Sequence, residues 1–168
     1  MGFTTIELLT VLVIIAILAG IAAPSFRPML ERWRVRNASE AMVSAVYYAR
    51  SEAIKRGGNV KLQKIANNTD GCTLAATNED WGCGWGVYST DTAGTATLLK
   101  TFAIPANVTV SIKDNTGSIP IDRWGTLTGV STKGIAMLPA GGSNSSPAAV
   151  GLCIAAGGRI KVIGNPPC

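Results

Sequence analysis

Four cysteines stand at positions 72, 83, 153 and 168, and their spacing bears on the chemistry that they can support. They fall into two close pairs, which predicts two disulfides and an oxidising compartment. Four thiolates are also a known zinc ligand set, but structural zinc sites usually place about two to four residues between paired ligands. Here 10 and 14 residues intervene, which favours disulfides and no metal. Of the three possible connectivities, the local pairs Cys72–Cys83 and Cys153–Cys168 close the shortest loops.

The composition argues against an enzyme. The chain contains no histidine, so the commonest general base and the commonest metal ligand are both missing. It also lacks a Ser/His/Asp set, paired carboxylates at acid–base spacing and a glycine-rich loop that would cradle phosphates. We therefore predict a protein without catalytic activity and without a cofactor.

Glu7 points to function because it lies at the start of an apolar segment. Residues 8–23 carry no charge, and Thr10 is their only polar side chain. A carboxylate one turn inside a membrane segment costs several kcal/mol unless it is paired, so we interpret Glu7 as functional. In the alternative interpretation, Glu7 lies at the headgroup level near the helix start, where the helix dipole favours a negative charge.

The segment around Glu7 is long enough to cross a bilayer. Residues 3–23 number 21, and as a helix they would span roughly 31 Å, against a bilayer core of about 30 Å. A secretory signal peptide would instead need a basic n-region, a shorter apolar run and a small-residue cleavage site. Only Met1 and Gly2 precede the run, and a helical pattern follows it. We therefore predict a single membrane anchor that carries a projecting domain.

The helix is predicted to continue beyond the apolar segment. Pro24 lacks a donor and clashes with the preceding turn, so we expect a kink or local melting there. An amphipathic stripe then recurs at steps of three and four, at Val35, Ala38, Met42, Ala45, Ala49 and Ala53. Gly57 and Gly58 are a plausible stop. The helix would run from about residue 3 to 56, with 3–27 as the membrane or filament-core half and 28–57 as the amphipathic half.

Residues 58–168 are predicted to form one globular β domain with two disulfides. The candidate strands, punctuated by Gly, Asn, Pro and Ser clusters, are 59–65, 84–89, 97–104, 107–113, 134–138, 149–155 and 158–163. Segment 139–147 is expected to be a loop or a hairpin tip. Three tryptophans are expected as core or loop anchors and not as base-stacking platforms: Trp81, Trp85 and Trp124. The fold class is therefore α+β, with a long N-terminal helix packed on an antiparallel sheet.

The N-terminal residues closely resemble the class III signal of type IV prepilins and type II secretion pseudopilins. The resemblance rests on the unbroken apolar run, on Pro24 and on the motif GFTTIELL at residues 2–9. It implies a type IV pilin fold, cleavage by a prepilin peptidase between Gly2 and Phe3, and N-methylation of Phe3. It also implies that Glu7 pairs with the N-terminal amine of a neighbouring subunit during assembly. Residues 1–2 would be the remainder of a leader, which in this family is normally longer and basic.

The end of the predicted helix is similar to one branch of that superfamily, the minor pilins of FimT and FimU type and the GspH-type pseudopilins. The similarity lies in residues 47–57 (YYARSEAIKRG), in a strand that follows at once, in the pair Trp85-Gly86 and in the late pair Gly158-Arg159. It implies a minor type IV pilin, a structural subunit for pilus assembly. The alternative is a GspH-type minor pseudopilin of a type II secretion system.

The resemblance also raises DNA binding. FimT-type pilins that capture DNA for natural transformation are thought to use a Gly-Arg-x-Arg motif, matched here by residues 158–161 (GRIK). Arg159 and Lys161 alternate along a predicted strand, and they are the only charged side chains from residue 134 onwards. Lysine keeps the charge but loses the bidentate fork of arginine. The net charge of +5 suits binding to a phosphate backbone or to anionic lipid, and the alternative interpretation is a mildly basic soluble surface. For Arg159 and Lys161, the alternative is that two cations protect a strand edge from pairing with another strand.

These features predict a protein held in the bacterial inner membrane by one span before assembly, with its globular domain in the periplasm. Its final place would be a pilus or a pseudopilus. The expected partners are other pilin subunits, the inner-membrane assembly machinery, the prepilin peptidase and the membrane itself, with DNA as a possible further partner.

Overall fold

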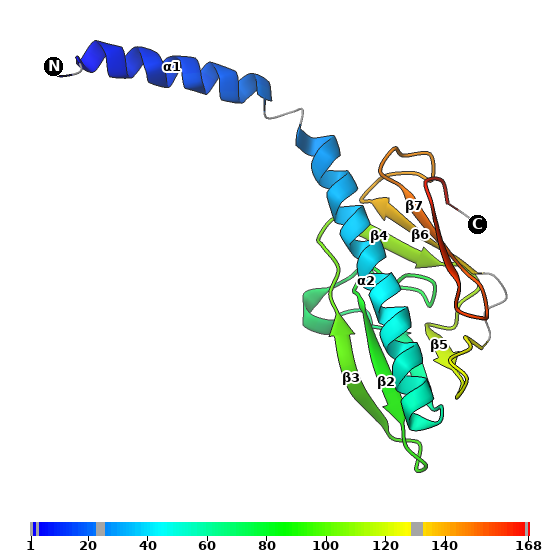
Figure 1. The fold of residues 1–168 in the computed structure, drawn as a ribbon. Helices are drawn as coiled ribbons and strands as arrows, with labels where there is room; N and C mark the ends of the chain where they lie inside the picture. Colours follow the sequence, from blue (N-terminus) through cyan, green and yellow to red (C-terminus); the bar gives the residue numbers. More distant parts are fainter. Residues whose placement is uncertain (1, 3, 23–25, 129–132, 167) are drawn as a thin grey trace. The chain divides into compact units, whose positions relative to one another are not determined.

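The computed structural model describes residues 2, 4–22, 26–128, 133–166 and 168 (Figure 1). The chain divides into two units, residues 1–31 and residues 32–168, and each is described by itself. Helices come first along the chain and strands follow, with a short 3-10 helix, η2 (Thr69–Gly71), among the strands. This order agrees with the predicted α+β class.

The first helix, α1 (Thr5–Ala22), is apolar on every side. Its large hydrophobic side chains are more than half exposed at Leu8, Leu12, Ile15 and Leu18. A helix without a polar face is suited to lipid or to an assembly of like helices. Its 18 residues rise about 27 Å, slightly less than a bilayer core of about 30 Å. Within the described residues no helix meets the length and hydropathy required of a membrane span, so the spanning helix predicted over 3–27 is not shown.

The single long helix predicted over residues 3–56 is instead two helices. The first ends at Ala22, and α2 runs over Arg27–Arg56. Pro24, where the sequence predicts a kink, lies outside the described residues. Pro28 is compatible with α2 because it lies in the first turn, where its missing N–H would have no partner within the helix.

The C-terminal end of α2 lies where the glycine pair predicts it. Gly57 adopts a φ of 74°, which favours glycine. The N–H of Gly58 donates to the carbonyl of Ala53 at 2.8 Å, and that of Gly57 donates to the carbonyl of Ile54 at 3.4 Å. These two bonds form a Schellman motif and satisfy carbonyls that the helix end would otherwise leave free.

The β domain contains two antiparallel four-stranded sheets (Figure 1). The first has the order β3-β2-β1-β5, from strands Ala96–Phe102, Trp85–Thr90, Val60–Lys64 and Ser118–Ile121. The second has the order β4-β6-β7-β8, from strands Val108–Ile112, Lys133–Pro139, Val150–Ile154 and Ile160–Ile163. Seven of these strands overlap the predicted ones, and the predicted loop 139–147 joins β6 to β7.

The strand that the sequence analysis missed is β5. It is only four residues long, and it contains Pro120, which argues against a strand in a sequence pattern. In the sheet Pro120 is tolerated because β5 is an edge strand next to β1, with Pro120 opposite Lys61. The edge position, which only the tertiary structure reveals, resolves the conflict.

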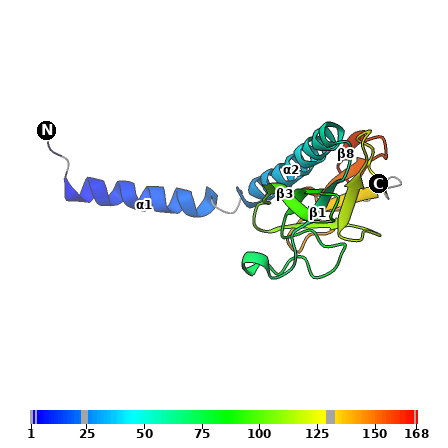
Figure 2. The same cartoon turned by 90° about the horizontal axis from the view of Figure 1, so that it is seen from below.

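One face of α2 is buried against both sheets, as Figure 2 shows from below. Its fully buried residues are Val35, Ala38, Met42, Ala45, Val46, Ala49 and Ala53, which include the whole predicted stripe. The first sheet contributes Leu62 and Val87 to the same core, and the second contributes Ile135 and Leu152. Since four of the helical residues are alanine, the helix backbone can lie close to the strands. This packing positions the last turns of α2 against the loops at one end of the sheets.

Both cysteine pairs form disulfides in the local connectivity. Cys72 is joined to Cys83 with an S–S distance of 2.06 Å, and Cys153 to Cys168 with 2.14 Å. These bonds exclude a zinc site built from the four cysteines, because sulfurs bonded to one another cannot act as thiolate ligands. In the described ranges no group of three or more His, Cys, Asp or Glu residues is arranged to hold a metal.

The loop closed by the first disulfide is also held by Lys64 at the end of β1. The Lys64 ammonium donates to the backbone carbonyls of Ala75 at 2.8 Å and Asp80 at 3.2 Å, and also to that of Thr77. Three carbonyl acceptors satisfy the three N–H donors of the ammonium. A lysine and a disulfide therefore order a loop that has little regular secondary structure.

Candidate functional site

Glu7 closes the N-terminal turn of α1. The helix begins at Thr5, so Thr4 is the N-cap and Glu7 is the third helical residue. The Thr4 N–H donates to Glu7 Oε2 at 2.9 Å, and the Thr4 hydroxyl donates to the same oxygen at 2.7 Å. The Glu7 N–H in turn donates to Thr4 Oγ1 at 3.4 Å, which completes a capping box. The carboxylate thus has a partner within its own chain, and Oε1 takes no part in these bonds.

The spacing Thr4-x-x-Glu7 is itself the sequence signature of a capping box, and it would have predicted this contact. The two residues predicted for processing lie just before the box. Gly2 is exposed and outside the helix, whereas Phe3 lies outside the described residues. The structure therefore places Glu7 in the first turn of α1.

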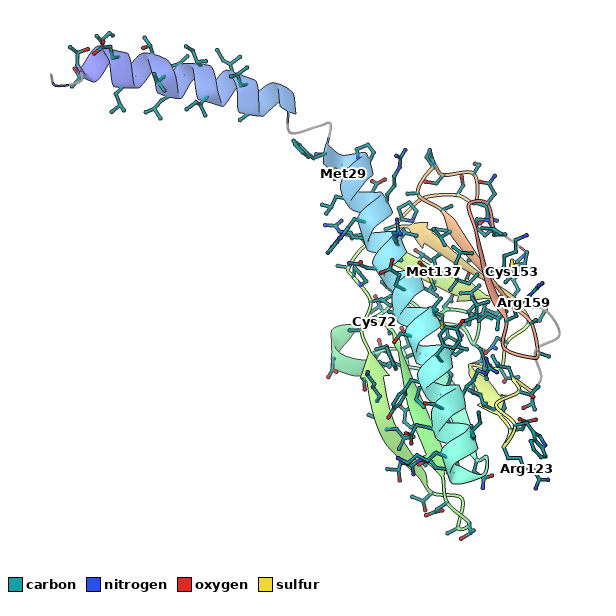
Figure 3. All side chains as sticks on the ribbon, in the orientation of Figure 1. Met29, Cys72, Arg123, Met137, Cys153 and Arg159 are labelled. Carbon is teal, nitrogen blue, oxygen red and sulfur yellow. A yellow bond between two sulfur atoms is a disulfide. The ribbon has the colours of Figure 1, made fainter. Side chains whose placement is uncertain are left out.

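Arg159 and Lys161 lie at the start of β8, the edge strand of the second sheet, and Figure 3 labels Arg159 there. In the pairing of β8 with β7, Ile160 is opposite the buried Ile154, and Lys161 is opposite Cys153. Arg159 directly precedes β8, Lys161 is the second residue of that strand, and both side chains are exposed. In the described part of the chain neither of them forms an ion pair.

Arg50 connects α2 to two loops near this face. Its Nε donates to the carbonyl of Gly125 at 2.8 Å, and its Nη1 donates to that of Gly158 at 3.3 Å. Gly158 has a φ of 80°, and a Cβ added there would lie 2.3 Å from Arg50 Cζ. Gly158, the glycine of the Gly158-Arg159 pair, therefore leaves room for the Arg50 guanidinium. Arg50 belongs to the helix-end motif of residues 47–57, but its two partners lie 75 and 108 residues further along the chain. A local sequence pattern therefore could not predict these hydrogen bonds.

The turn formed by residues 122–126 presents Trp124 to solvent. The Trp124 N–H donates to Asp122 Oδ1 at 2.9 Å, and the Thr126 N–H donates to the same oxygen at 2.8 Å. The Trp124 side chain is 75% exposed, and the Arg123 guanidinium lies 5.8 Å from the centroid of its ring. Trp81 and Trp85 are fully buried, as core anchors should be, whereas the exposed Trp124 side chain is not buried as a core or loop anchor would be.

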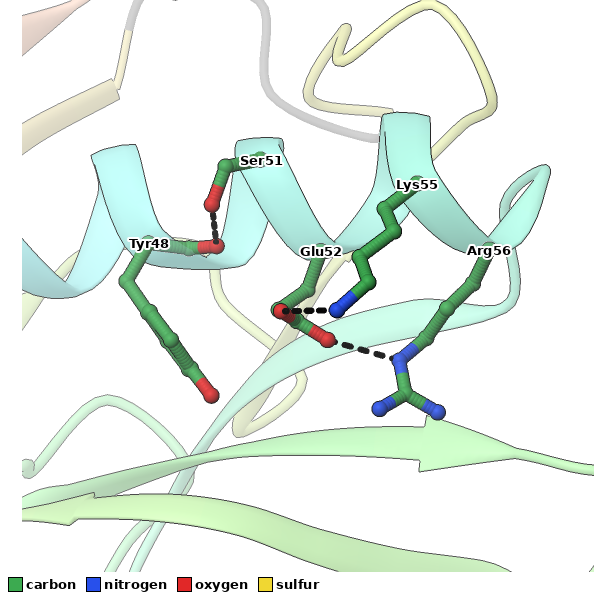
Figure 4. A network of polar contacts seen from close by, with 5 residues as sticks. All are labelled: Tyr48, Ser51, Glu52, Lys55 and Arg56. Carbon is green, nitrogen blue, oxygen red and sulfur yellow. Dashed lines mark hydrogen bonds and ion pairs between the residues drawn. The ribbon is translucent and has the colours of Figure 1, made fainter.

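Glu52 joins two cations at the end of α2 (Figure 4). Arg56 Nε donates to Glu52 Oε2 at 2.7 Å, and Lys55 Nζ lies 4.0 Å from Glu52 Oε1. The hydrogen bond from Arg56 lowers the pKa of Glu52, the charges of Lys55 and Arg56 act in the same direction, and desolvation opposes them. Glu52 thus neutralises two cations of the helix end, whereas Arg159 and Lys161 have no acidic partner among the residues that the structure describes.

Comparison with known proteins finds one family and one fold. The family described as Type II transport protein GspH matches residues 38–166. Two crystal structures of the type IV minor pilin FimU from Pseudomonas aeruginosa share the fold at 22% identity. The first has a TM-score of 0.60, and the match covers 83% of this chain and 92% of the FimU chain. The second has a TM-score of 0.57, and the match covers 76% of this chain and 90% of the FimU chain. The minor pseudopilin EpsH from the type 2 secretion system of Vibrio cholerae has 8% identity and a TM-score of 0.52, covering 78% of this chain and 97% of its own. No curated protein matches.

Alanine at position 158 should disrupt the contact with Arg50. Since φ is positive and the added Cβ overlaps the guanidinium, we expect Gly158→Ala to lower the free energy of unfolding by about 1–3 kcal/mol. Urea unfolding followed by tryptophan fluorescence measures this loss. Gly157→Ala is the matched control, because nothing lies within 4 Å of its added Cβ, and it should change stability by less than about 0.5 kcal/mol. Equal losses in the two variants would contradict the role assigned to Gly158.

The Glu52 contacts should make stability depend on pH. Because its pKa is lower in the folded protein than in the unfolded chain, Glu52 stabilises the fold above the unfolded pKa, and this contribution is lost as the pH falls through the folded pKa. Glu52→Gln should therefore lower the free energy of unfolding near neutral pH, and its difference from wild type should shrink as the solution is acidified below the ordinary glutamate value of 4.5. Glu40→Gln, which breaks the exposed pair with Arg36, should have a smaller effect. A Glu52→Gln difference that does not change with pH would contradict this account.

Proposed function

The chain belongs to the Type II transport protein GspH family, within the superfamily of type IV pilins and pseudopilins, and we propose that it is a minor type IV pilin of the FimU kind. Since proteins of this group are pilin or pseudopilin subunits, the chain is a structural subunit and not an enzyme. The family description supports the alternative, a GspH-type minor pseudopilin of a type II secretion system. Deletion of the gene distinguishes the two, because the first predicts loss of pili and the second loss of protein secretion.

The observation that carries the assembly role is an apolar helix with one carboxylate at its start. α1 exposes large apolar side chains around its circumference, so its surface requires lipid or other apolar helices. Glu7 is the only charged residue of α1. The capping box uses Oε2, which leaves Oε1 to accept a charge-assisted hydrogen bond from the amine of a neighbouring subunit.

The proposal includes a route through the membrane. Residues 3–27 would lie in the inner membrane before assembly and in the filament core afterwards, with the β domain in the periplasm. A prepilin peptidase would cut between Gly2 and Phe3 and methylate Phe3, and inner-membrane assembly machinery would bring the subunit together with other pilins. The two disulfides support a periplasmic domain, because they need an oxidising compartment.

The role of Glu7 can be tested with a variant that keeps its hydrogen bonds to Thr4 and removes its charge. Glutamine can also complete a capping box, so Glu7→Gln keeps the cap and removes the charge. We expect Glu7→Gln and Glu7→Ala to lower incorporation into filaments by about 10- to 100-fold, the value of a charged hydrogen bond. Immunoblots of sheared filaments and of membranes measure the ratio of assembled to membrane-held subunit. Thr10→Val, which alters a polar side chain one turn further along, should incorporate normally. Normal incorporation of Glu7→Gln would show that the cap is enough and would refute the pairing.

We propose DNA binding as a second function of the same protein, at Arg159 and Lys161. The supporting observation is that both cations are exposed, two residues apart, without a carboxylate partner in the described residues. Two such cations can hold phosphates without reading bases, which predicts weak binding that is sensitive to salt.

This proposal predicts a result for a gel-shift assay with the full chain in detergent. Arg159→Ala/Lys161→Ala should reduce the affinity for DNA. It should also make the slope of log affinity against log salt concentration shallower, by the equivalent of about two phosphate contacts. Arg36→Ala/Lys113→Ala removes the same charge at other exposed positions and serves as the control. If the two double variants retard DNA equally, the site is not at Arg159 and Lys161.

A further inference from the structure

We infer that Trp124 is a stacking platform for unpaired bases, so that nucleic acid held by Arg159 and Lys161 binds in preference as a single strand. The inference rests on the DNA binding proposed above. It adds the class of nucleic acid and the residue that selects it, in place of the anchoring role predicted for Trp124 from the sequence.

The turn that carries Trp124 is held by several backbone hydrogen bonds. Besides the two bonds to Asp122 Oδ1, the Gly125 N–H donates to the carbonyl of Asp122 at 3.0 Å. The turn also lies close against the end of α2, since a Cβ added at Gly125 would be 3.1 Å from Ile54 Cδ1. Although Trp124 is 75% exposed, it therefore stands on a backbone fixed by hydrogen bonds and packing. Because the backbone is already fixed, stacking a base on Trp124 costs only the ordering of its side chain, which has two rotatable bonds.

The same contacts bring this turn beside the strand that carries the cations. The Arg50 guanidinium binds the carbonyl of Gly125, which follows Trp124, and the carbonyl of Gly158, which precedes Arg159. A second link is the hydrogen bond of 3.0 Å from the Leu127 N–H to the carbonyl of Ala156. The exposed tryptophan and the exposed arginine thus come from two adjacent turns that one side chain holds together.

The charges of this surface favour an anionic ligand. Asp122 is the only carboxylate of the turn, and its Oδ1 is already engaged by two backbone N–H groups. Arg123 lies over the Trp124 ring and adds a cation beside it. Phosphates can follow Arg123, Arg159 and Lys161 while a base stacks on the indole, the combination by which proteins bind single strands.

A duplex cannot use the tryptophan in the same way. In a double helix the faces of the bases are covered by their neighbours, and exposing one costs unstacking and unpairing. A single strand offers these faces freely, and stacking on an aromatic residue is worth about a 5- to 150-fold gain in affinity per base. The phosphate contacts are common to both forms, so Trp124 is the residue that should distinguish them.

An exposed Trp beside Arg123 and Ile54 also has the composition of a protein contact. Nucleic acid is favoured because the cations on the adjacent strand form no ion pair within the described residues, and a protein partner would have to supply several acids to match them. The protein partner is therefore one of the outcomes of the test.

The test measures the affinity of the full chain, in nonionic detergent, for a labelled oligo-dT strand and for a duplex of equal length by fluorescence anisotropy. Trp124→Ala should weaken binding of the single strand by about 5- to 150-fold and change duplex binding by less than about twofold. Trp124→Phe, which keeps an aromatic face, should retain most of the preference. Trp33→Ala is the matched control, since Trp33 is also exposed, at 58%, and lies between two arginines.

Each other outcome overturns a defined part of the account. If Arg159→Ala/Lys161→Ala weakens both ligands and Trp124→Ala changes neither, the stacking inference is wrong and the DNA proposal stands. An equal loss of single-strand and duplex binding in Trp124→Ala also refutes the preference. If the wild-type chain binds neither ligand, the DNA proposal itself fails. A loss of filament incorporation in Trp124→Ala, with unchanged DNA binding, would assign the residue to a protein contact.

Discussion

Burial of the small-residue face of α2 is the constraint on which the second unit depends. Alanines at positions 38, 45, 49 and 53 are fully buried, so the helix backbone lies close to the two sheets. That approach brings the last turns of the helix within reach of turns at the end of both sheets. Arg50 uses this proximity, since its guanidinium binds a carbonyl in each of two turns. A bulkier face on α2 would hold the helix further out and leave those carbonyls without this donor.

Gly158 shows how a functional motif can have a structural component. In the motif Gly158-Arg159, the arginine carries the charge and is the residue predicted to bind phosphate. In the fold, the glycine allows a positive φ and leaves space for a different arginine, Arg50. The exposed cation of the motif therefore depends for its position on a partly buried cation from the helix.

Glu7 reconciles two demands on one carboxylate. As the third residue of α1 it satisfies the backbone donor at Thr4, which a helix end in an apolar environment cannot leave unpaired. In the assembly role proposed above, its charge would attract the amine of a neighbouring subunit through the other oxygen. The cap orders the helix end and orients the carboxylate, so the two roles support each other.

Periodicity and composition alone determined much of this protein: the amphipathic stripe of α2, its glycine stop, seven of the strands, the local disulfides and the place of Glu7 in the first turn of an apolar helix. These features depend on residues close together in the chain, where steric preference and hydrophobic spacing act directly. Only the tertiary structure decided that Pro120 lies in an edge strand, that the strands form two sheets, that Trp124 is exposed and that Arg50 joins two turns. Each of these depends on contacts between segments distant in sequence, and a local pattern cannot encode which distant carbonyl or strand will lie within reach after the core has packed.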